Sequence, residues 1–517
     1  MAPGPTFAAA SGHVPRGACR AGAPSSRTDS VPRRRAVPGG RVSPVPSTAL
    51  PPSAAPRNGA VSFWYAATGL PPRRAPLPGP READVCIVGG GYTGLWTAYY
   101  LLRADPALRV VVLEREFCGY GASGRNGGWV TAALAGTRTR FAATHGREGV
   151  VALQRAMEAT VDEVLRVARE EGVDCDAVKG GELTVARTPA QLARLRAAVA
   201  EDHAWGATDH VLLDADETAR RVRVEGALGG SWTPHCARVQ PAKLVRGLAA
   251  VVEGLGAAVH ESTPVTRVEP GRAVTPYGDV VAPVVLRATE GFTARLPGLR
   301  RTWLPMNSSM VVTAPLGDAR WAAIGWDGCE TLGDAAHAYV YAQRTADGRI
   351  ALGGRGVPYR YASRTDADGA TPATTVRQLQ GVLARMFPAA ADVPLEHAWS
   401  GVLAVPRDWC STAGLDPRTG LGWAGGYVGH GVATANLAGR TLRDLALAHL
   451  GGGPAGTALT RLPWVGRRVR GWEPEPLRWL GVQALYAAYR SADRLEEARG
   501  GSTSTVARVA DVVSGRH

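Results

Sequence analysis

A run of closely spaced glycines gives this sequence its clearest indication of chemistry. Gly89, Gly91 and Gly94 follow directly after the wholly apolar run Val85–Val88. In such a turn the first glycine permits a tight reversal, the second lets the backbone approach a pyrophosphate, and the third lets a helix pack closely on the strand. Because a helix N-terminus stabilises negative charge, this spacing predicts a phosphate site at the start of the next helix.

A carboxylate stands where the sugar of a bound nucleotide is expected. A second apolar run, Val110–Leu113, ends at Glu114, 20 residues after the last glycine, and an acid at that separation can accept hydrogen bonds from ribose hydroxyls. A glycine-rich turn in another α/β protein is the alternative, but it does not explain strand, turn, helix, strand and acid in this order. We therefore expect a dinucleotide on a Rossmann-type unit, beside Tyr92, Thr93 and Arg115.

A second loop, residues 121–128, is dense in glycine and short polar residues. Its sequence is Gly-Ala-Ser-Gly-Arg-Asn-Gly-Gly. Such a loop can bring backbone N–H groups and an arginine against phosphates or a flavin ring. An ordinary surface loop has the same composition, but the position directly after the expected ribose-binding acid favours the cofactor. The candidate contacts are Gly121, Ala122, Ser123, Arg125, Asn126, Gly127 and Gly128.

These segments resemble the FAD-dependent family of D-amino-acid oxidase, glycine oxidase and sarcosine oxidase. They are most similar to its gamma-glutamylputrescine oxidoreductase branch, in which the loop sequence above is characteristic, and Ser62-Phe63-Trp64 resembles that branch's lead-in. The resemblance implies FAD as the cofactor, with the main chain of Val265 meeting adenine and with Ala288 and Thr289 near the pyrophosphate. Glu290 replaces the family's usual asparagine at the next position.

A glycine-rich segment near the end of the chain resembles the family's second flavin segment. Glycines there would let the main chain lie against the flavin, and a helix N-terminus would stabilise negative charge on the reduced ring. Taken alone, the segment could be a glycine-rich turn between a strand and a helix. The residues that the resemblance places at the flavin are Gly426, Tyr427, Gly429, His430, Gly431 and Val432.

The resemblance implies an α/β fold, with a Rossmann-type FAD-binding domain and an inserted α+β substrate domain whose sheet is mainly antiparallel. Residues 82–160, 236–300 and 398–449 would form the FAD-binding domain, and residues 161–235 and 301–397 the substrate domain. The hydrophobic patterns are compatible with this division. They predict helices over residues 93–103, 161–172 and 189–205 and strands over 308–313, 337–344 and 349–353.

Residues 450–517 are expected to form a C-terminal helical extension. Within it, Trp479, Val482, Tyr486 and Tyr489 share one face of a helix predicted from about residue 475 to 499. Packing of this face on the body or on a second subunit is the main interpretation. A helix lying on a membrane surface is the alternative.

The charge of the chain does not indicate nucleic-acid binding. The net charge is +14, but residues 1–60 hold eight arginines and one acid, and the other half of the excess is spread over 457 residues without a basic stripe. Residues 1–60 are rich in Pro, Ala, Ser and Gly and are expected to be a disordered tail. No apolar run reaches the ~18 residues that span a bilayer. The seven widely spaced cysteines predict neither disulfides nor a metal site, and they favour a cytoplasmic location.

The expected reaction is oxidation of a small amine or amino acid, with hydride transfer to flavin N5 and with O2 or another carrier as the final electron acceptor. The candidates for catalysis or substrate binding are His430, Tyr341, Arg344 and Arg355, with Tyr339 on the same strand as Tyr341. A dehydrogenase of hydroxy acids or of another substrate class in the same fold is the alternative function.

Two departures from the sarcosine oxidases bear on the cofactor. Gly401 stands where those enzymes carry the cysteine that bonds to the flavin, so we expect non-covalent FAD. Ala351 stands where they carry a lysine that activates oxygen, so a dehydrogenase is as consistent with the sequence as an oxidase.

Overall fold

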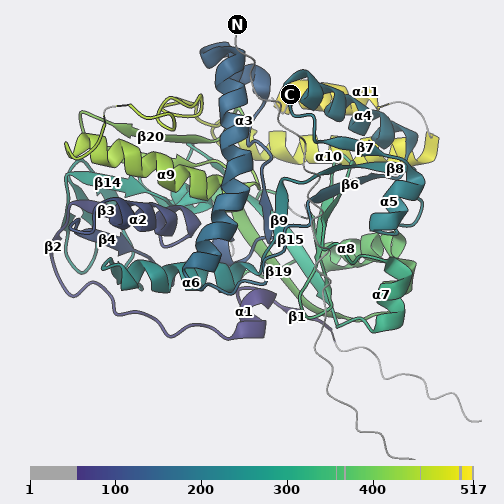
Figure 1. The fold of residues 1–517 in the computed structure, drawn as a ribbon, viewed down its shortest axis with the longest axis horizontal. Coiled ribbons are helices and arrows are strands. Elements are labelled where there is room, and N and C mark those ends of the chain that lie inside the picture. The colour runs from purple at the N-terminus through teal and green to yellow at the C-terminus, as the bar shows by residue number, and fades with distance from the viewer. Residues whose placement is uncertain are drawn as a thin grey trace, which may run out of the picture. The chain divides into compact units, whose positions relative to one another are not determined.

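The structure is a computed structural model that describes residues 55–354, 356, 358–365, 368–454, 456–499 and 503–514. Two large β-sheets, each with its own helices, organise this part of the chain. In Figure 1 the six-stranded sheet lies on the left with helices α2 and α9, and the nine-stranded sheet lies on the right with α7 and α8.

The six-stranded sheet has the order β10-β4-β3-β14-β21-β20. Its neighbours are parallel except for the last pair, which is antiparallel. The strands are β3 (Val85–Val88), β4 (Val110–Leu113), β10 (Ala258–His260), β14 (Val284–Arg287), β20 (Thr412–Asp416) and β21 (Leu421–Gly425). All residues of β3, β4 and β14 are buried, as expected for central strands covered on both faces. The runs predicted for β3 and β4 are confirmed to the residue.

Four long helices accompany this sheet. They are α2 (Tyr92–Ala104), α3 (Arg138–Glu170), α6 (Pro241–Gly254) and α9 (Gly431–His449). α3 begins 23 residues before the predicted helix over 161–172 and changes direction at Gly146, whose φ of 64° and ψ of −175° are not helical. Few side chains of α3 before Val150 are buried, so the first half of the helix has a mixed polar pattern from which it was not predicted.

The nine-stranded sheet has the order β1-β19-β15-β18-β17-β16-β6-β8-β7. All neighbouring pairs are antiparallel except β1 with β19 and β16 with β6. The strands are β1 (Arg57–Asn58), β6 (Glu182–Ala186), β7 (Val211–Leu213), β8 (Gly229–Thr233), β15 (Leu304–Thr313), β16 (Thr331–Asp334), β17 (Val340–Arg344), β18 (Ile350–Gly354) and β19 (Leu395–Val405). This mainly antiparallel sheet agrees with the α+β pattern expected for the substrate domain.

Shorter elements complete the described chain. They are α1 (Phe63–Thr68), α4 (Pro189–Ala204), α5 (Ala215–Arg221), α7 (Asp318–Ile324), α8 (Ala373–Met386), α10 (Leu477–Arg499), α11 (Thr505–Ser514), the 3-10 turns η1 (Ala122–Gly124), η2 (Glu290–Arg295), η3 (Tyr361–Ser363) and η4 (Pro388–Ala390), and the small sheets of β2 (Arg81–Glu82), β11 (Arg267–Glu269), β12 (Arg272–Val274), β13 (Val280–Val281), and of β5 (Trp129–Thr131) with β9 (Cys236–Arg238).

The structure changes one boundary of the predicted tail. Residues 57–58 form β1, which pairs with β19, and the Gly59 N–H donates to Ala398 O at 2.9 Å. A polar, proline-rich sequence can still join a sheet edge, because the edge supplies hydrogen bonds that the segment cannot make locally. Residues 1–54 lie outside the described part of the chain.

The predicted domain division remains a proposal. The six-stranded sheet takes its strands from the three segments assigned to the FAD-binding domain, which supports that assignment. However, α3 crosses the boundary at residue 160 and β19 crosses the boundary at residue 398.

The apolar face of α10 packs on the body. Val482 is buried in a cluster with Leu304 and Met306 of β15, and Trp479 and Tyr486 lie against the same cluster. This contact supports the packing interpretation over the membrane-surface one. In the residues that the structure describes, no helix is both long and apolar enough to span a bilayer.

Close packing between α2 and α9 gives a test of this fold. A methyl group at Gly439 of α9 would lie 2.8 Å from the backbone of Trp96, so we expect Gly439→Ala to lower the free energy of unfolding by roughly 1–3 kcal/mol. Gly381→Ala in α8 is the matched control: its methyl group would meet only the Arg385 side chain at 3.5 Å, and the helix propensity of alanine should raise stability by up to about 1 kcal/mol. Urea unfolding measures both, and equal effects would contradict the packing.

Candidate active site

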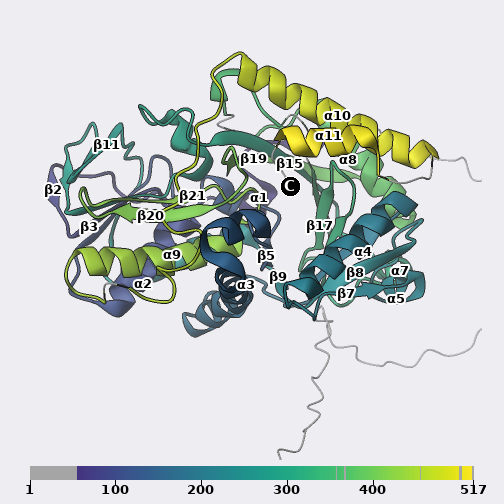
Figure 2. The same cartoon turned by 90° about the horizontal axis from the view of Figure 1, so that it is seen from above.

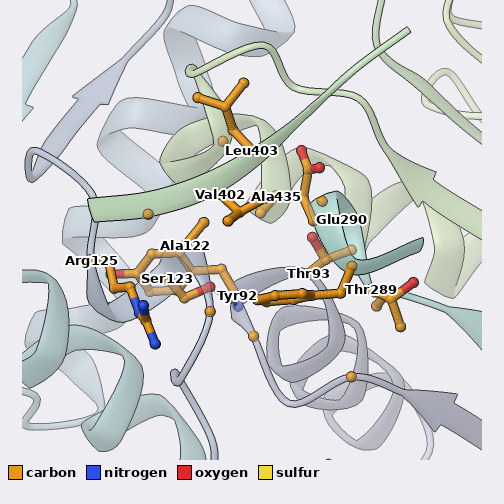
Figure 3. A pocket seen from close by; sticks show the side chains of 18 of the residues that line it. Tyr92, Thr93, Ala122, Ser123, Arg125, Thr289, Glu290, Val402, Leu403 and Ala435 are labelled. Carbon is orange, nitrogen blue, oxygen red and sulfur yellow. Dashed lines mark hydrogen bonds between the residues drawn. The ribbon is translucent and has the colours of Figure 1, made fainter. Parts of the chain in front are cut away.

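One cavity of about 510 Å³ follows the edge of the six-stranded sheet where the parallel strands end. Its wall includes Gly89 after β3, Glu114 after β4, Thr289 after β14 and His430 after β21. In the sheet, β3 has β4 on one side and β14 on the other, so later parts of the chain add strands on both sides of it. Doubly wound sheets bind their ligands at the edge beside such a strand. Figure 3 shows side chains from α2, from η1 and from β19 converging on the same space.

Most residues predicted to bind a cofactor line this cavity. They are Gly89, Gly91, Tyr92, Thr93, Glu114, Arg115, Gly121, Ala122, Ser123, Arg125, Asn126, Gly127, Val265, Ala288, Thr289, Tyr427, Gly429, His430, Gly431 and Val432. They come from six separate stretches of sequence, so the structure brings together what the motifs implied only separately.

Three predicted glycines do not line the cavity but shape its walls. A Cβ at Gly94 would lie 2.0 Å from Gly89 O, so this glycine lets α2 pack on the turn, as the motif implies. Gly128 has a φ of +73°, and a Cβ there would lie 2.2 Å from Val239 O. Gly426 has a φ of +74° and faces Pro406.

Glu114 is held in place by two backbone amides. Its Oε2 accepts from Gly90 N at 2.8 Å, and its Oε1 accepts from Glu116 N at 2.9 Å. Burial raises the pKa of this carboxyl, and the two N–H donors oppose the rise. Each carboxylate oxygen can accept a second hydrogen bond, so Glu114 keeps acceptor capacity for a ribose hydroxyl.

Four side chains from three distant segments hold loop 121–128, which forms one wall of the cavity. Each donates a hydrogen bond to one of four consecutive backbone carbonyls. The pairs are Ser62 Oγ to Gly124 O at 2.7 Å, Trp399 Nε1 to Arg125 O at 2.9 Å, Trp64 Nε1 to Asn126 O at 2.9 Å and Gln343 Nε2 to Gly127 O at 2.6 Å. Residues from β17, β19 and the segment before the first glycine motif therefore fix this loop.

The side chains of Arg125 and Asn126 form hydrogen bonds with the backbone of the loop and of Tyr120, the residue before it. Arg125 is buried, its Nε donates to Tyr120 O at 2.8 Å, and its guanidinium lies 4.5 Å from the centre of the Tyr120 ring. Asn126 Oδ1 accepts from Gly128 N at 2.7 Å, and its Nδ2 donates to two carbonyls of the loop. Both residues line the cavity, but these contacts indicate that they shape the wall.

Glu290 links three segments at the edge of the cavity. Its Oε1 accepts from Tyr427 N at 3.0 Å, and its Oε2 accepts from Ala404 N at 2.8 Å. Burial raises its pKa to about 7, while the two amides and the nearby Arg287 oppose that rise. The replacement of the family's asparagine therefore supplies a carboxylate that ties η2 to β19 and to the start of the second flavin segment.

Aromatic and hydroxyl side chains contact one another in one part of the cavity wall, which we call the aromatic end. The Tyr341 hydroxyl and Ser308 Oγ lie 2.8 Å apart, and Trp129 meets the Tyr341 ring edge-to-face at 6.2 Å. Thr131 and Tyr339 also line the cavity. Sequence reasoning singled out the two tyrosines but missed Trp129, Thr131 and Ser308. The position of Trp129 directly after the glycine-rich loop could have identified it, whereas nothing local marks Ser308.

A match to a family model accompanies this geometry. Residues 84–445 match the model described as FAD dependent oxidoreductase. The chain belongs to this family. The match spans both glycine motifs and most strands of the two large sheets. It confirms the family expected from the sequence and the dependence on FAD.

The names of similar proteins agree with the branch of the family that the sequence resembles. The chain is 29% identical over 394 residues to gamma-glutamylputrescine oxidoreductase of Escherichia coli K12 and 31% identical over 400 residues to the probable oxidoreductase OrdL of Rhizobium meliloti; each alignment covers 74% of this chain and 88% of the relative. The structure of glycine oxidase from Geobacillus kaustophilus is similar with a TM-score of 0.60 and 20% identity, over 71% of this chain and 95% of that one. This likeness confirms the predicted α/β fold.

The cavity fits the FAD of this family. Glu114 and Val265 line it where the resemblance places the adenosine half, the N-terminus of α2 lies where the phosphates are expected, and residues 429–432, at the start of α9, line the same cavity. Gly91 leaves no room for a side chain, because a Cβ there would lie 2.9 Å from Ser123 Oγ. One cavity thus joins the residues expected at each part of a dinucleotide.

One of the predicted substrate-binding residues does not line the cavity, and another is not among the described residues. Arg344 does not line the cavity: its Nη1 donates to Trp326 O at 2.7 Å and to Asp327 at 2.9 Å, and its guanidinium covers the Trp321 ring. The reason is the alternation of side chains along β17, since a residue three positions after Tyr341 points to the opposite face. Arg355 lies outside the described residues.

The two departures from the sarcosine oxidases lie differently in the structure. Gly401 lines the cavity, as expected for the position of a flavin-linked cysteine, and no cysteine is among the residues of the wall. Ala351 is buried in a cluster with Phe63 and Trp399 and does not line the cavity. The only two lysines of the chain pair with aspartates elsewhere.

The raised pKa of Glu290 predicts a pH dependence of stability. Because the folded value of about 7 lies above the unfolded value of 4.5, the folded state binds the proton more tightly. The resulting stabilisation is complete below pH 4.5 and is lost as the pH rises through 7, by up to about 3 kcal/mol.

Urea unfolding at pH 5 and pH 8 measures this difference. Between pH 5 and pH 8 the wild type should lose more stability than Glu290→Gln, because only the wild type carries the Glu290 carboxyl. Other buried acids, such as Asp334, should contribute the same loss of stability in both proteins. An equal loss of stability in wild type and variant would show that Glu290 does not titrate in this range.

Proposed function

We propose that this chain oxidises the carbon–nitrogen bond of a small amine or amino acid, with non-covalent FAD as the electron acceptor. Bound FAD accepts a hydride from a carbon next to an amine nitrogen. The observation that carries the proposal is the wall of the cavity: the rings of Trp129, Tyr339 and Tyr341 line the same space as the glycine motifs and as His430, the N-cap residue of α9. The names of the relatives, which act on gamma-glutamylputrescine and on glycine, support the substrate class.

The protein's own contribution to such a reaction is positioning. Hydride transfer needs a neutral amine whose C–H bond points at the acceptor, and correct placement lowers the barrier more than acid–base groups do. Aromatic rings from β5 and β17 bound the space in which the substrate would lie, and the paired hydroxyls of Tyr341 and Ser308 can hold its polar group. The start of α9 would favour the negative charge that the reduced cofactor gains.

A second proposal concerns the compound that takes the electrons from the reduced enzyme. No lysine lines the cavity, and both lysines of the chain are described. Since a cation near the ring assists electron transfer to oxygen, we propose that reduced enzyme reacts slowly with O2 and passes electrons to another carrier. Rapid reoxidation by air-saturated buffer would contradict this.

Product identification tests the proposed reaction. The purified enzyme is incubated with diamines, N-methyl amino acids, D-amino acids, L-amino acids and hydroxy acids, each with an artificial electron acceptor. A carbonyl product with equimolar ammonia or amine would support amine oxidation. A keto acid formed only from hydroxy acids, without release of nitrogen, would instead establish the alternative dehydrogenase.

Removal of the Tyr341 hydroxyl should weaken catalysis without loss of the cofactor. Tyr341→Phe removes one partner of the 2.8 Å contact with Ser308, and a lost hydrogen bond of about 1–1.5 kcal/mol corresponds to a decrease of roughly tenfold in kcat/KM. Tyr277→Phe, at an exposed tyrosine, is the control. Steady-state kinetics and the FAD content of each variant measure the effect; unchanged kcat/KM would remove Tyr341 from the substrate site.

Non-covalent binding predicts that acid releases the cofactor. Gly401 cannot form a thioether, and the cavity wall holds no cysteine. After acid precipitation, the yellow colour should therefore appear in the supernatant. Colour retained in the pellet would show a covalent bond to another residue.

A further inference from the structure

The loop between β16 and β17 carries a tyrosine to the cavity. It comprises residues 335–339, and Tyr339 at its end lines the aromatic end of the cavity. Asp334 Oδ1 accepts from Val340 N at 2.9 Å, which closes the base of the loop. The position of Tyr339 therefore depends on what holds the rest of the loop.

Helix α10 holds the middle of this loop through one carboxylate. Asp493 Oδ1 accepts from His337 N at 2.8 Å, and its Oδ2 accepts from Ala338 N at 2.9 Å. Two adjacent backbone amides thus share the two oxygens of one side chain. Such charge-assisted hydrogen bonds are stronger than neutral ones.

A second set of contacts, around the buried His337, reinforces the first. Glu496, one turn further along α10, places Oε1 2.9 Å from His337 Nε2, and Tyr489 of the same helix stacks on the imidazole at 6.0 Å. Arg194 of α4 donates to Glu496 Oε2 at 2.8 Å and to Ala335 O at 2.8 Å. His337, Asp493 and Glu496 are close enough to ligate a metal ion, but Arg194 already pairs with Glu496 and both Asp493 oxygens already accept backbone N–H groups, so we interpret the cluster as a clamp.

The clamp comes from outside the region that matches the family model. That region ends at residue 445, whereas α10 comprises Leu477–Arg499. Figure 2 shows α10 and α11 side by side, and the two helices contact each other. A helix outside the matched region, α10, therefore holds a loop of the cavity wall.

We propose that Asp493 and Glu496 are positioning residues for the substrate: through residues 335–338 they fix Tyr339 in the wall of the substrate end. This inference rests on the proposed function of the cavity. It predicts that loosening the clamp widens the substrate end and weakens substrate binding, while the dinucleotide end near Glu114 keeps its affinity for FAD.

Amide exchange tests whether the clamp exists. In the FAD-loaded full-length protein, Asp493→Asn should speed hydrogen–deuterium exchange in peptides containing the amides of His337 and Ala338 by roughly tenfold or more, because a neutral amide offers one acceptor in place of two. Glu497→Gln, an exposed acid next to Glu496 on the same helix, is the matched control and should leave exchange unchanged. Glu496→Gln is a second variant in case the first does not fold.

Kinetics then test what the clamp does. With an amine that reduces the wild-type enzyme, Asp493→Asn should raise KM roughly five- to tenfold with a smaller change in kcat and an unchanged dissociation constant for FAD. In a Tyr339→Ala background the same substitution should change KM by less than about twofold, because its target is gone. Unchanged exchange, or faster exchange with unchanged KM, would overturn the proposal.

A probe that needs no substrate separates this inference from the proposed function. Iodide quenches flavin fluorescence by collision, so its quenching constant reports access to the ring. The constant should rise in Asp493→Asn and stay at the wild-type value in Glu497→Gln. If no amine reduces the wild-type enzyme, the proposed function fails, and the quenching result alone decides the clamp: equal constants would refute it.

Discussion

The four hydrogen bonds to consecutive carbonyls of loop 121–128 join the two large sheets at the cavity. Ser62 and Trp64 donate from the segment before the first glycine motif, and Gln343 and Trp399 donate from strands of the nine-stranded sheet. Small residues let the loop approach the cofactor space, but they leave its backbone without side-chain packing to fix it. Buried carbonyls must find donors, and here those donors tie a wall of the cavity to β17, to β19 and to the segment before the first glycine motif.

How far the sequence predicts this site depends on whether the signal is local. The turn at Gly89 and the strands β3 and β4 agree with the prediction, because each part of that motif has its own backbone requirement within 30 residues. Glu114 lines the cavity, and its contact with a ribose stays a prediction. The donors to loop 121–128 were not predicted, since the contact between Trp399 and Arg125 spans 274 residues. The prediction for Arg344 treats its spacing from Tyr341 as period two, which would put both side chains on one face of the strand. The two residues are three positions apart, so their side chains point to opposite faces of β17.

The family match and the substrate assignment rest on different parts of the structure. The family match carries the FAD dependence, and relatives are named for different substrates, gamma-glutamylputrescine and glycine. The substrate end is built from β5, β15, β17 and the loop of residues 335–339, which α10 holds from beyond the matched region. Differences among family members in substrate and in electron acceptor are therefore expected to lie at this end, where the described wall offers aromatic rings and hydroxyls and no lysine.

Anaerobic reduction of the purified holoenzyme tests the central claim most directly. The visible spectrum is recorded while amines, amino acids and hydroxy acids are added one at a time without oxygen. We expect the flavin band near ~450 nm to bleach with at least one amine or amino acid and with no hydroxy acid, since the proposed reaction takes a hydride from a carbon next to an amine nitrogen. Bleaching by hydroxy acids alone, or a purified protein that contains no flavin and cannot be reconstituted with FAD, would contradict it.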